Sequence, residues 1–196
     1  MSLAKAVGYV GAGTLEYLYD STTKEFFFIE MNTRIQVEHP VTEMLTGTDL
    51  VQEMIHVAGG GKLRQSQEDI TRSGHAIEVR LNAEDPMMQF LPFPGQVSSL
   101  KLPEGDGIRF DHFLYEDYQV PPFYDSLLGK LIVHAEDRDA AIALMITALE
   151  GLEIGGLKTT KPLHLALAHD PAVRADDFHT QWLEPWLAAG NLKPTP

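Results

Sequence analysis

The sequence of 196 residues contains no cysteine. This absence excludes disulfides, thiolate zinc sites and cysteine nucleophiles, and it fits a cytoplasmic protein. No apolar run is long enough to form a membrane-spanning helix. The first residues, Met1 to Lys5, lack the apolar core of a signal peptide. We therefore expect a cytoplasmic protein that has no membrane partner.

Positive charge is scarce in this chain. There are 15 lysines and arginines against 28 aspartates and glutamates, which gives a formal net charge of −13. Such a surface repels a phosphate backbone, so we expect no nucleic-acid partner. The sequence also has no glycine-rich phosphate-binding loop. If the protein handles a nucleotide, the cations for its phosphates must be local or must lie outside this chain.

The first third of the chain predicts a β-hairpin followed by a loop and a helix. Partial alternation of apolar and polar residues at 14–19 indicates a half-buried strand, and an aromatic-rich strand is expected at 26–31. A polar turn at 20–25 joins them. A polar loop at 33–40 comes next, and a helix begins after Asp49 and ends at three glycines, 59–61.

The rest of the chain predicts mainly strands with segregated helices. Strands are expected at 75–81, 96–102, 107–112 and 127–135, and helices at 138–152, 162–168 and 180–189. This pattern indicates the α+β class. We divide the chain into a first part at 1–61, a polar connector at 62–73, a second domain at 74–190 and a tail at 191–196.

Three oxygen-bearing side chains are expected to meet on the hairpin. Glu16 lies in the first strand and Glu30 near the end of the second, and Asn32 follows two residues later on the same side. Oxygen donors of this kind suit Mg²⁺, which commonly shares them with substrate phosphates. The alternative is a solvated strand end with ordinary salt bridges. Because the strand around the carboxylates is apolar, their burial would need compensation, and the two interpretations stay open.

A second polar group follows directly in the loop. Arg34, Gln36 and Glu38 alternate, so they could present a cation, an amide and a carboxylate to one small anion. An arginine fork matches an anion such as bicarbonate, and a glutamate within reach could remove its proton. A structural ion-pair network in an ordered loop explains the same spacing equally well.

These segments closely resemble the signature of the biotin carboxylases, which include subunits or domains of acetyl-CoA, propionyl-CoA, methylcrotonyl-CoA, pyruvate and urea carboxylases. The resemblance covers residues 5 to 189. It is carried by GTLEY at 13–17, FIEMNTRIQVEHPVTE at 28–43, GHAIEVRLNAEDP at 74–86, FLP at 90–92, PG at 94–95, YDSLLGKL at 124–131 and GLKT at 156–159. A pattern of this length is far more specific than a single glycine motif.

The resemblance implies the C-terminal part of an ATP-grasp domain at 1–61, and a mainly antiparallel biotin carboxylase C-terminal domain at 74–190. It implies that ATP and Mg²⁺ or Mn²⁺ are bound and that bicarbonate is the substrate. The implied roles are metal binding by Glu16, Glu30 and Asn32; adenine contact by Leu18; bicarbonate binding by Arg34, Gln36 and the backbone of Val37; deprotonation of bicarbonate by Glu38; and stabilisation of the biotin enolate by Arg80.

The alternative for Arg80 is a simple ion pair with Glu78 or Glu84, which its spacing alone favours. The histidines at 39, 75, 164 and 169 match no zinc pattern and are expected to be structural. None of the seven methionines neighbours a lysine, so biotin is expected on a separate carrier protein or domain. The resemblance further implies a carboxyltransferase partner and a possible homodimer.

Two departures from the family pattern stand out. The resemblance begins where a biotin carboxylase is more than half finished, so the lid and the phosphate-binding lysines are missing, and we expect the chain alone to be inactive. Thr160 stands where the resemblance leads us to expect asparagine, and the bend at 87–89 is longer than usual. A non-catalytic binding or dimerisation module of the same family, or another ATP-grasp ligase, are the alternatives.

Overall fold

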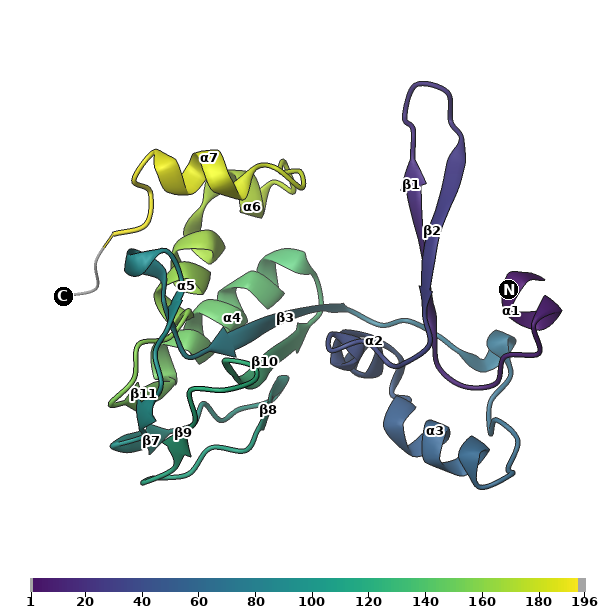
Figure 1. The fold of residues 1–196 in the computed structure, drawn as a ribbon, viewed down its shortest axis with the longest axis horizontal. Coiled ribbons are helices and arrows are strands. Elements are labelled where there is room, and N and C mark those ends of the chain that lie inside the picture. The colour runs from purple at the N-terminus through teal and green to yellow at the C-terminus, as the bar shows by residue number, and fades with distance from the viewer. Residues whose placement is uncertain (1, 194–196) are drawn as a thin grey trace. The chain divides into compact units, whose positions relative to one another are not determined.

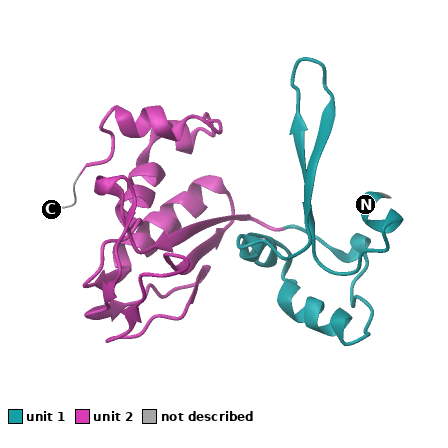
Figure 2. Cartoon of the chain, in the orientation of Figure 1, with its two compact units in different colours: residues 1–72 teal, residues 73–196 magenta. Residues whose placement is uncertain are grey.

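The computed structural model of the chain describes residues 2–193. It divides into two compact units, one ending at Arg72 and the other beginning at Ser73 (Figures 1 and 2). Helices and antiparallel strands occur together, which confirms the α+β class. Over residues 2–193, no helix combines the length and the hydrophobicity that crossing a membrane requires.

The first unit is built around the predicted hairpin. Its elements are α1 (Ser2–Ala6), β1 (Thr14–Tyr19), β2 (Phe26–Asn32), α2 (His39–Thr46), α3 (Leu50–Ala58) and the 3₁₀ turn η1 (Gln67–Asp69). Strands β1 and β2 pair antiparallel, and in Figure 1 they form a long two-stranded ribbon. Both strands lie where the sequence predicts them.

The turn of the hairpin is organised by Asp20. Its Oδ1 accepts hydrogen bonds from the backbone N–H groups of Thr22, at 2.7 Å, and Thr23, at 3.2 Å. These bonds lower the pKa of Asp20 below its ordinary value, and the bond from Thr22 has the largest effect. Lys24 then takes a left-handed conformation, with φ of 62°, and closes the turn.

The hairpin differs from the prediction in its burial. Residues 16–19 of β1 are exposed, so the prediction of a half-buried strand is wrong. Large apolar side chains are exposed on both strands; they are Tyr17, Leu18, Tyr19, Phe26, Phe27, Phe28 and Ile29. Within the described residues, neither strand pairs with a third one. Alternation predicts a buried face only where another layer covers that face.

The loop expected at 33–40 ends earlier than predicted, because α2 begins at His39. Pro40 lies in the first turn of this helix. Proline is tolerated there because the N–H groups of a first turn have no partner within the helix. Helix α3 lies where it was predicted, and the side chain of its N-cap residue, Asp49, accepts a hydrogen bond from Gln52 N at 2.8 Å. The buried Glu43 links the two helices, since its Oε1 accepts from Leu50 N at 2.8 Å.

The second unit contains the main hydrophobic core. Strands β3 (His75–Asn82), β10 (Leu127–Ala135) and β8 (Ile108–His112) form an antiparallel sheet in the order β3-β10-β8. Helix α4 (Arg138–Gly151) lies beside this sheet in Figure 1. Leu81, Leu131 and Val133 of the sheet pack with Met145 and Leu149 of the helix, and all five side chains are buried.

Short ribbons and helices complete this unit. The ribbons are β4 (Glu84–Asp85) with β5 (Leu91–Pro92), β6 (Gly95–Gln96) with β9 (Gln119–Val120), and β7 (Ser99–Lys101) with β11 (Glu153–Gly155); the helices are η2 (Pro86–Met88), α5 (Lys161–His169), α6 (Pro171–Arg174) and α7 (Leu183–Ala188). The single strand predicted at 96–102 is wrong. The chain changes partner there, because Val97 N bonds to Tyr118 O whereas Ser98 N bonds to Gly155 O.

The C-terminal helices enclose a small cluster of buried side chains apart from the main core. Leu163, Trp186 and Leu192 form it, and the ring centroids of Trp182 and Trp186 lie 5.7 Å apart. Trp186 Nε1 donates to Asp170 Oδ2 at 2.7 Å. Leu192 falls within the predicted tail, so the start of that tail is packed; residues 194–196 lie outside the described residues.

Candidate active site

The two glutamates of the hairpin meet as their spacing predicts. Glu16 and Glu30 are cross-strand partners in the β1–β2 ladder. Asn32 lies two residues after Glu30, and its Nδ2 donates to Glu16 Oε1 at 2.7 Å and to Glu30 Oε1 at 3.3 Å. One amide therefore holds both carboxylates on the same face of the hairpin.

The donor set suits a hard divalent cation. All three side chains carry oxygen, and Mg²⁺ is commonly held by one or two carboxylates together with phosphate oxygens and water. A half-turn of the Asn32 amide would present its oxygen in place of its nitrogen. No group of three or more His, Cys, Asp or Glu side chains suited to a metal occurs within residues 2–193. This pair of carboxylates thus fits a cation that is shared with a ligand, and not a site closed by protein alone.

The loop after β2 is ordered by its own polar groups. One guanidinium nitrogen of Arg34 donates to Gln36 Oε1 at 2.9 Å and to the carbonyl of Ile35 at 3.1 Å. The carbonyl of Gln36 accepts from Nδ1 of His39 at 2.7 Å. Because a carbonyl can only accept, His39 carries a proton on Nδ1. Arg34 and Gln36, predicted to act on one anion, are therefore adjacent and face each other.

A depression of about 280 Å³ lies along this loop. Arg34, Gln36 and Glu38 all line it, so the three alternating residues of the sequence share one surface. Its other lining residues are Ala12, Gly13, Thr14, Ile35, His39, Thr42 and Leu50. The depression presents a cation, an amide and a carboxylate together, which is the chemistry expected for a small oxyanion.

Of three further residues, Gly13 lines the depression, whereas Val37 and Leu18 are not among its lining residues. A Cβ on Gly13 would lie 2.9 Å from Cε of Met31 and 3.3 Å from the carbonyl of Asn32, so a larger residue here would require Met31 and the start of the loop to shift. Val37 lies between Gln36 and Glu38 in the loop. Leu18 is exposed on β1 opposite Phe27 and does not line the depression.

Arg80, the remaining predicted residue, belongs to the second unit. It lies on β3 with its side chain exposed, and its carbonyl accepts hydrogen bonds from Thr160 Oγ1, at 3.1 Å, and His164 Nε2, at 2.8 Å. Thr160, a departure from the family pattern, is thus a buried partner of the Arg80 backbone. The hairpin site thus belongs to the first unit and Arg80 to the second.

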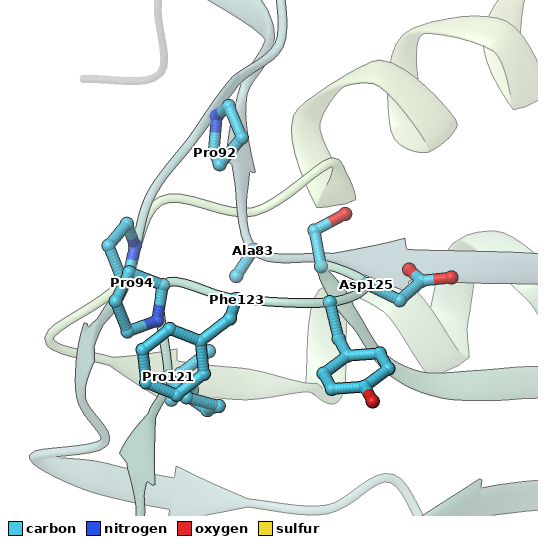
Figure 3. A pocket seen from close by; sticks show the side chains of 10 residues that line it. Ala83, Pro92, Pro94, Pro121, Phe123 and Asp125 are labelled. Atoms are coloured by element: carbon cyan, nitrogen blue, oxygen red, sulfur yellow. The ribbon is translucent and has the colours of Figure 1, made fainter.

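A second hollow, which the sequence reasoning missed, lies in the second unit. Figure 3 shows Pro92, Pro94, Pro121 and Phe123 around it, next to Ala83. Beside it, Asn82 Nδ2 donates to Glu84 Oε1 at 3.1 Å and to Ser126 Oγ at 3.0 Å, and Ser126 Oγ also donates to Glu84 Oε1. The segments at 74–86 and 124–131 both contribute to this network, but their spacing in the sequence gives no sign of the hollow.

Comparison with known families divides the chain as its structure does. The family described as the biotin carboxylase C-terminal domain matches residues 78–185, which is more than half of the chain. The family described as the carbamoyl-phosphate synthase L chain, ATP binding domain, matches residues 1–66. Each match falls within one of the two compact units.

Similar proteins extend over nearly the whole chain. Biotin carboxylase 1 of Bacillus subtilis is 48% identical over 188 residues, which cover 96% of this chain and 42% of the relative. The biotin carboxylase of Pseudomonas aeruginosa is 51% identical over 178 residues, which cover 91% of this chain and 39% of the relative. The chain therefore spans about two fifths of the length of these relatives.

The fold is also found among solved structures. The biotin carboxylase domain dimer of the 2-oxoglutarate carboxylase from Hydrogenobacter thermophilus, in complex with MgADP, ADP and bicarbonate, matches with a TM-score of 0.92 and 46% identity. That match covers 98% of this chain and 42% of the other. Sequence motifs, fold and family match agree, and the chain belongs to the biotin carboxylase family.

Proposed function

We propose that this chain contributes the metal-carboxylate and bicarbonate residues of a biotin carboxylase, which uses ATP and bicarbonate to carboxylate biotin on a separate carrier. The observation that supports this most is the bridge from Asn32 to Glu16 and Glu30, with Arg34 and Gln36 paired in the adjoining loop. The relative from Hydrogenobacter thermophilus binds MgADP and bicarbonate, the two ligands that such residues would take.

In this proposal Glu16, Glu30 and Asn32 hold Mg²⁺ or Mn²⁺ against the phosphates of ATP. A cation there neutralises the phosphate charge on which phosphoryl transfer depends. Leu18, on the same strand as Glu16, contacts the adenine. The exposed position of Leu18 leaves its side chain available for that contact.

Bicarbonate occupies the depression lined by Arg34, Gln36 and Glu38. The Arg34 guanidinium offsets the charge of the anion, and Gln36 and the backbone of Val37 orient it. Glu38 removes its proton, so that an oxygen of the resulting dianion attacks the γ-phosphate and ADP leaves. The carboxyphosphate formed breaks into carbon dioxide and phosphate, and this phosphate deprotonates biotin.

Arg80 of the second unit stabilises the biotin enolate, because a fixed cation lowers the energy of a developing oxyanion.

We propose the C-terminal part of an ATP-grasp domain at 1–61, a connector at 62–73 and a biotin carboxylase C-terminal domain at 74–190. The partners are a biotin carrier protein or domain, a carboxyltransferase and a second copy of the subunit. The proposed compartment is the cytoplasm.

A chimera tests this proposal. The chain replaces the matched 188-residue stretch of the Bacillus subtilis biotin carboxylase 1, and bicarbonate-dependent ATP hydrolysis is measured with free biotin. The chimera is expected to turn over, whereas the chain alone, which has no glycine-rich phosphate loop, is expected to show no turnover. Hydrolysis by the chain alone would overturn the account of the missing phosphate-binding groups.

Two variants of the chimera separate the site from the hairpin as a whole. Glu30→Gln removes one metal carboxylate and should lower kcat at least tenfold. Glu25→Gln makes the same chemical change in the turn of the same hairpin and should leave kcat within twofold. Equal effects of the two substitutions would show that the paired carboxylates have no special role.

One alternative also rests on a specific observation, the match of residues 1–66 to the carbamoyl-phosphate synthase ATP-binding domain. If the first unit served a ligase of that kind, ammonia and not biotin would stimulate the ATP hydrolysis of the chimera. The match of residues 78–185 to the biotin carboxylase C-terminal domain favours biotin.

A further inference from the structure

Strand β3, which carries Arg80, lies at the edge of its sheet. The strand order β3-β10-β8 gives β3 a strand partner on one side only. Backbone groups that face away from β10 still need hydrogen-bond partners if water is excluded from them. At residues 80 and 82 these partners come from the beginning of helix α5.

Four hydrogen bonds make this connection. Thr160 N donates to Asn82 O at 3.1 Å, and Asn82 N donates to Thr160 Oγ1 at 3.1 Å. Thr160 Oγ1 donates to Arg80 O at 3.1 Å, and His164 Nε2 donates to the same carbonyl at 2.8 Å. Thr160 and His164 thus hold the outer edge of β3 on both sides of Leu81. We call these four bonds the α5 clamp.

The use of the Thr160 hydroxyl is unusual for its position. Thr160 is the N-cap residue of α5, where a threonine side chain ordinarily accepts a hydrogen bond from the first turn of its own helix. Here it makes no such bond, and its hydroxyl is directed to β3 instead. Helix α5 therefore lacks a side-chain cap from Thr160, because the hydroxyl bonds to the backbone of β3.

The inner edge of β3 is irregular at the same place. The register of β3 with β10 shifts between Leu127 and Gly129, opposite Leu81 and Asn82. A bulge of this kind interrupts the ladder and increases the local twist. Arg80 still pairs with Lys130, but the backbone directly after it, at Leu81 and Asn82, has weaker support from β10, and the α5 clamp supplies support from the other edge.

The chemistry of His164 fits a permanent donor. Because its partner is a carbonyl, the ring must carry a proton on Nε2. Burial lowers the pKa of His164, and the bond to Arg80 O acts in the opposite direction more weakly. A neutral ring that is protonated on Nε2 satisfies both conditions.

We propose that Thr160 and His164 are positioning residues that fix the backbone of Arg80 and so direct its guanidinium toward the biotin enolate. This inference rests on the proposed role of Arg80. Neither residue touches substrate; both act through the carbonyl of Arg80. A rotation of the strand at this point would swing the long arginine side chain away from a developing charge, where placement decides the stabilisation.

The test is NMR spectroscopy of the full chain of 196 residues. Thr160→Val removes the hydroxyl at nearly constant shape, and His164→Leu removes the ring donor. Thr160→Ser and His164→Gln keep a donor at each position. Thr147→Val is the matched control, because the Thr147 hydroxyl donates to Ala143 O within α4. The readouts are hydrogen exchange of the Asn82 amide and the chemical shift and order parameter of the Arg80 Nε–H group.

Thr160→Val is expected to speed exchange of the Asn82 amide about tenfold, since it leaves that N–H without its partner. The double variant Thr160→Val/His164→Leu should shift the Arg80 Nε–H signal and lower its order parameter, while Thr160→Ser and His164→Gln restore both. Thr147→Val should change neither. An unchanged Arg80 signal in the double variant, together with a lower unfolding midpoint, would overturn the proposal, because a purely structural contact behaves in that way.

These measurements need no turnover, so they are independent of the chimera. Arg80→Ala in the chimera tests the role on which the inference rests and should lower the rate of biotin carboxylation. Full carboxylation by Arg80→Ala would refute the proposed role of Arg80 even if the NMR results showed a working clamp.

Discussion

Replacing Asn32 by aspartate should weaken the hairpin and at the same time strengthen its hold on a divalent cation. The Asn32 amide nitrogen donates to carboxylate oxygens of Glu16 and Glu30 at 2.7 and 3.3 Å. Aspartate removes both donors and places a third negative charge between the two carboxylates. The three side chains then offer a cation three carboxylates in place of two carboxylates and an amide.

The loss of stability that Asn32→Asp causes in the absence of metal can be estimated from these distances. At about 3 Å, two unit charges repel by about 1.4 kcal/mol in the dielectric of water, and Asn32→Asp creates two such pairs. The side chains are exposed and can rotate apart, so most of this repulsion is relieved. With the loss of two hydrogen bonds of modest net value, we expect the free energy of unfolding to fall by about 1 to 2 kcal/mol.

When a divalent cation is bound, the added carboxylate is favourable and raises the affinity for the metal. A carboxylate about 4 Å from a divalent cation gains about 2 kcal/mol in water, which is more than tenfold in affinity. Mn²⁺ binding should be measured by titration calorimetry on the chain, and stability by urea unfolding with and without Mn²⁺. Asn32→Leu is the control, because it removes the same donors without adding charge and should not bind Mn²⁺ more tightly. If Asn32→Asp binds Mn²⁺ no more tightly than the parent chain, these side chains do not converge on a cation.

Three further predictions concern the second unit. Leu131 is fully buried in the core, so Leu131→Ala should lower the free energy of unfolding in urea by about 3 to 5 kcal/mol; a loss under about 1 kcal/mol would contradict that packing. Gly74 has φ of +70°, and a Cβ there would collide with the carbonyl of Ala135; Gly74→Ala should therefore destabilise the chain more than Gly60→Ala, where φ is +88° but the space is open. Equal losses for the two glycines would show that conformation alone matters. Burial lowers the pKa of His164, so the unfolded chain binds this proton more readily. The stability contributed by neutral His164 is complete above about pH 6.5 and is lost as the pH falls toward its folded pKa, and urea unfolding between pH 7 and pH 5 should show a smaller decline in His164→Gln.

The sequence predicts the local elements of this chain well. The hairpin follows from two apolar strands around a turn that begins with Asp20, and α3 follows from its Asp49 cap and terminal glycines. Strand β10 lies at the predicted residues, 127–135. In each case neighbouring residues contain the whole signal, because the pattern and its caps lie within one segment.

Features that depend on distant partners could not be predicted. The strand expected at 96–102 is divided because Val97 and Ser98 bond to different segments, at Tyr118 and Gly155. The exposure of the hairpin depends on which layers cover it, and alternation along one strand carries no information on that. The sequence does not predict helix α2, because a proline such as Pro40 is typical both of a loop and of the first turn of a helix.

The candidate site shows the same division. Glu16, Glu30 and Asn32 meet because strand pairing has a fixed periodicity, so their convergence follows from the sequence. The roles assigned to them, and to Arg34, Gln36 and Glu38, come from the family resemblance and stay predictions. In the sequence Thr160 is only a departure from the family pattern; its bonds to β3 span about eighty residues of sequence, which no local pattern encodes.

The neighbouring indoles near the C-terminus determine what fluorescence can report. Trp182 and Trp186 are the only two tryptophans in the chain, and Trp186 is buried and tied to Asp170. Their emission is therefore an optical probe of the C-terminal helices, whereas the fluorophores of the hairpin itself are Tyr17 and Tyr19. Because four of the six tyrosines lie outside the hairpin, tyrosine emission is not specific for a cation at Glu16 and Glu30, and replacing Tyr17 and Tyr19 is needed to assign a change on addition of Mn²⁺.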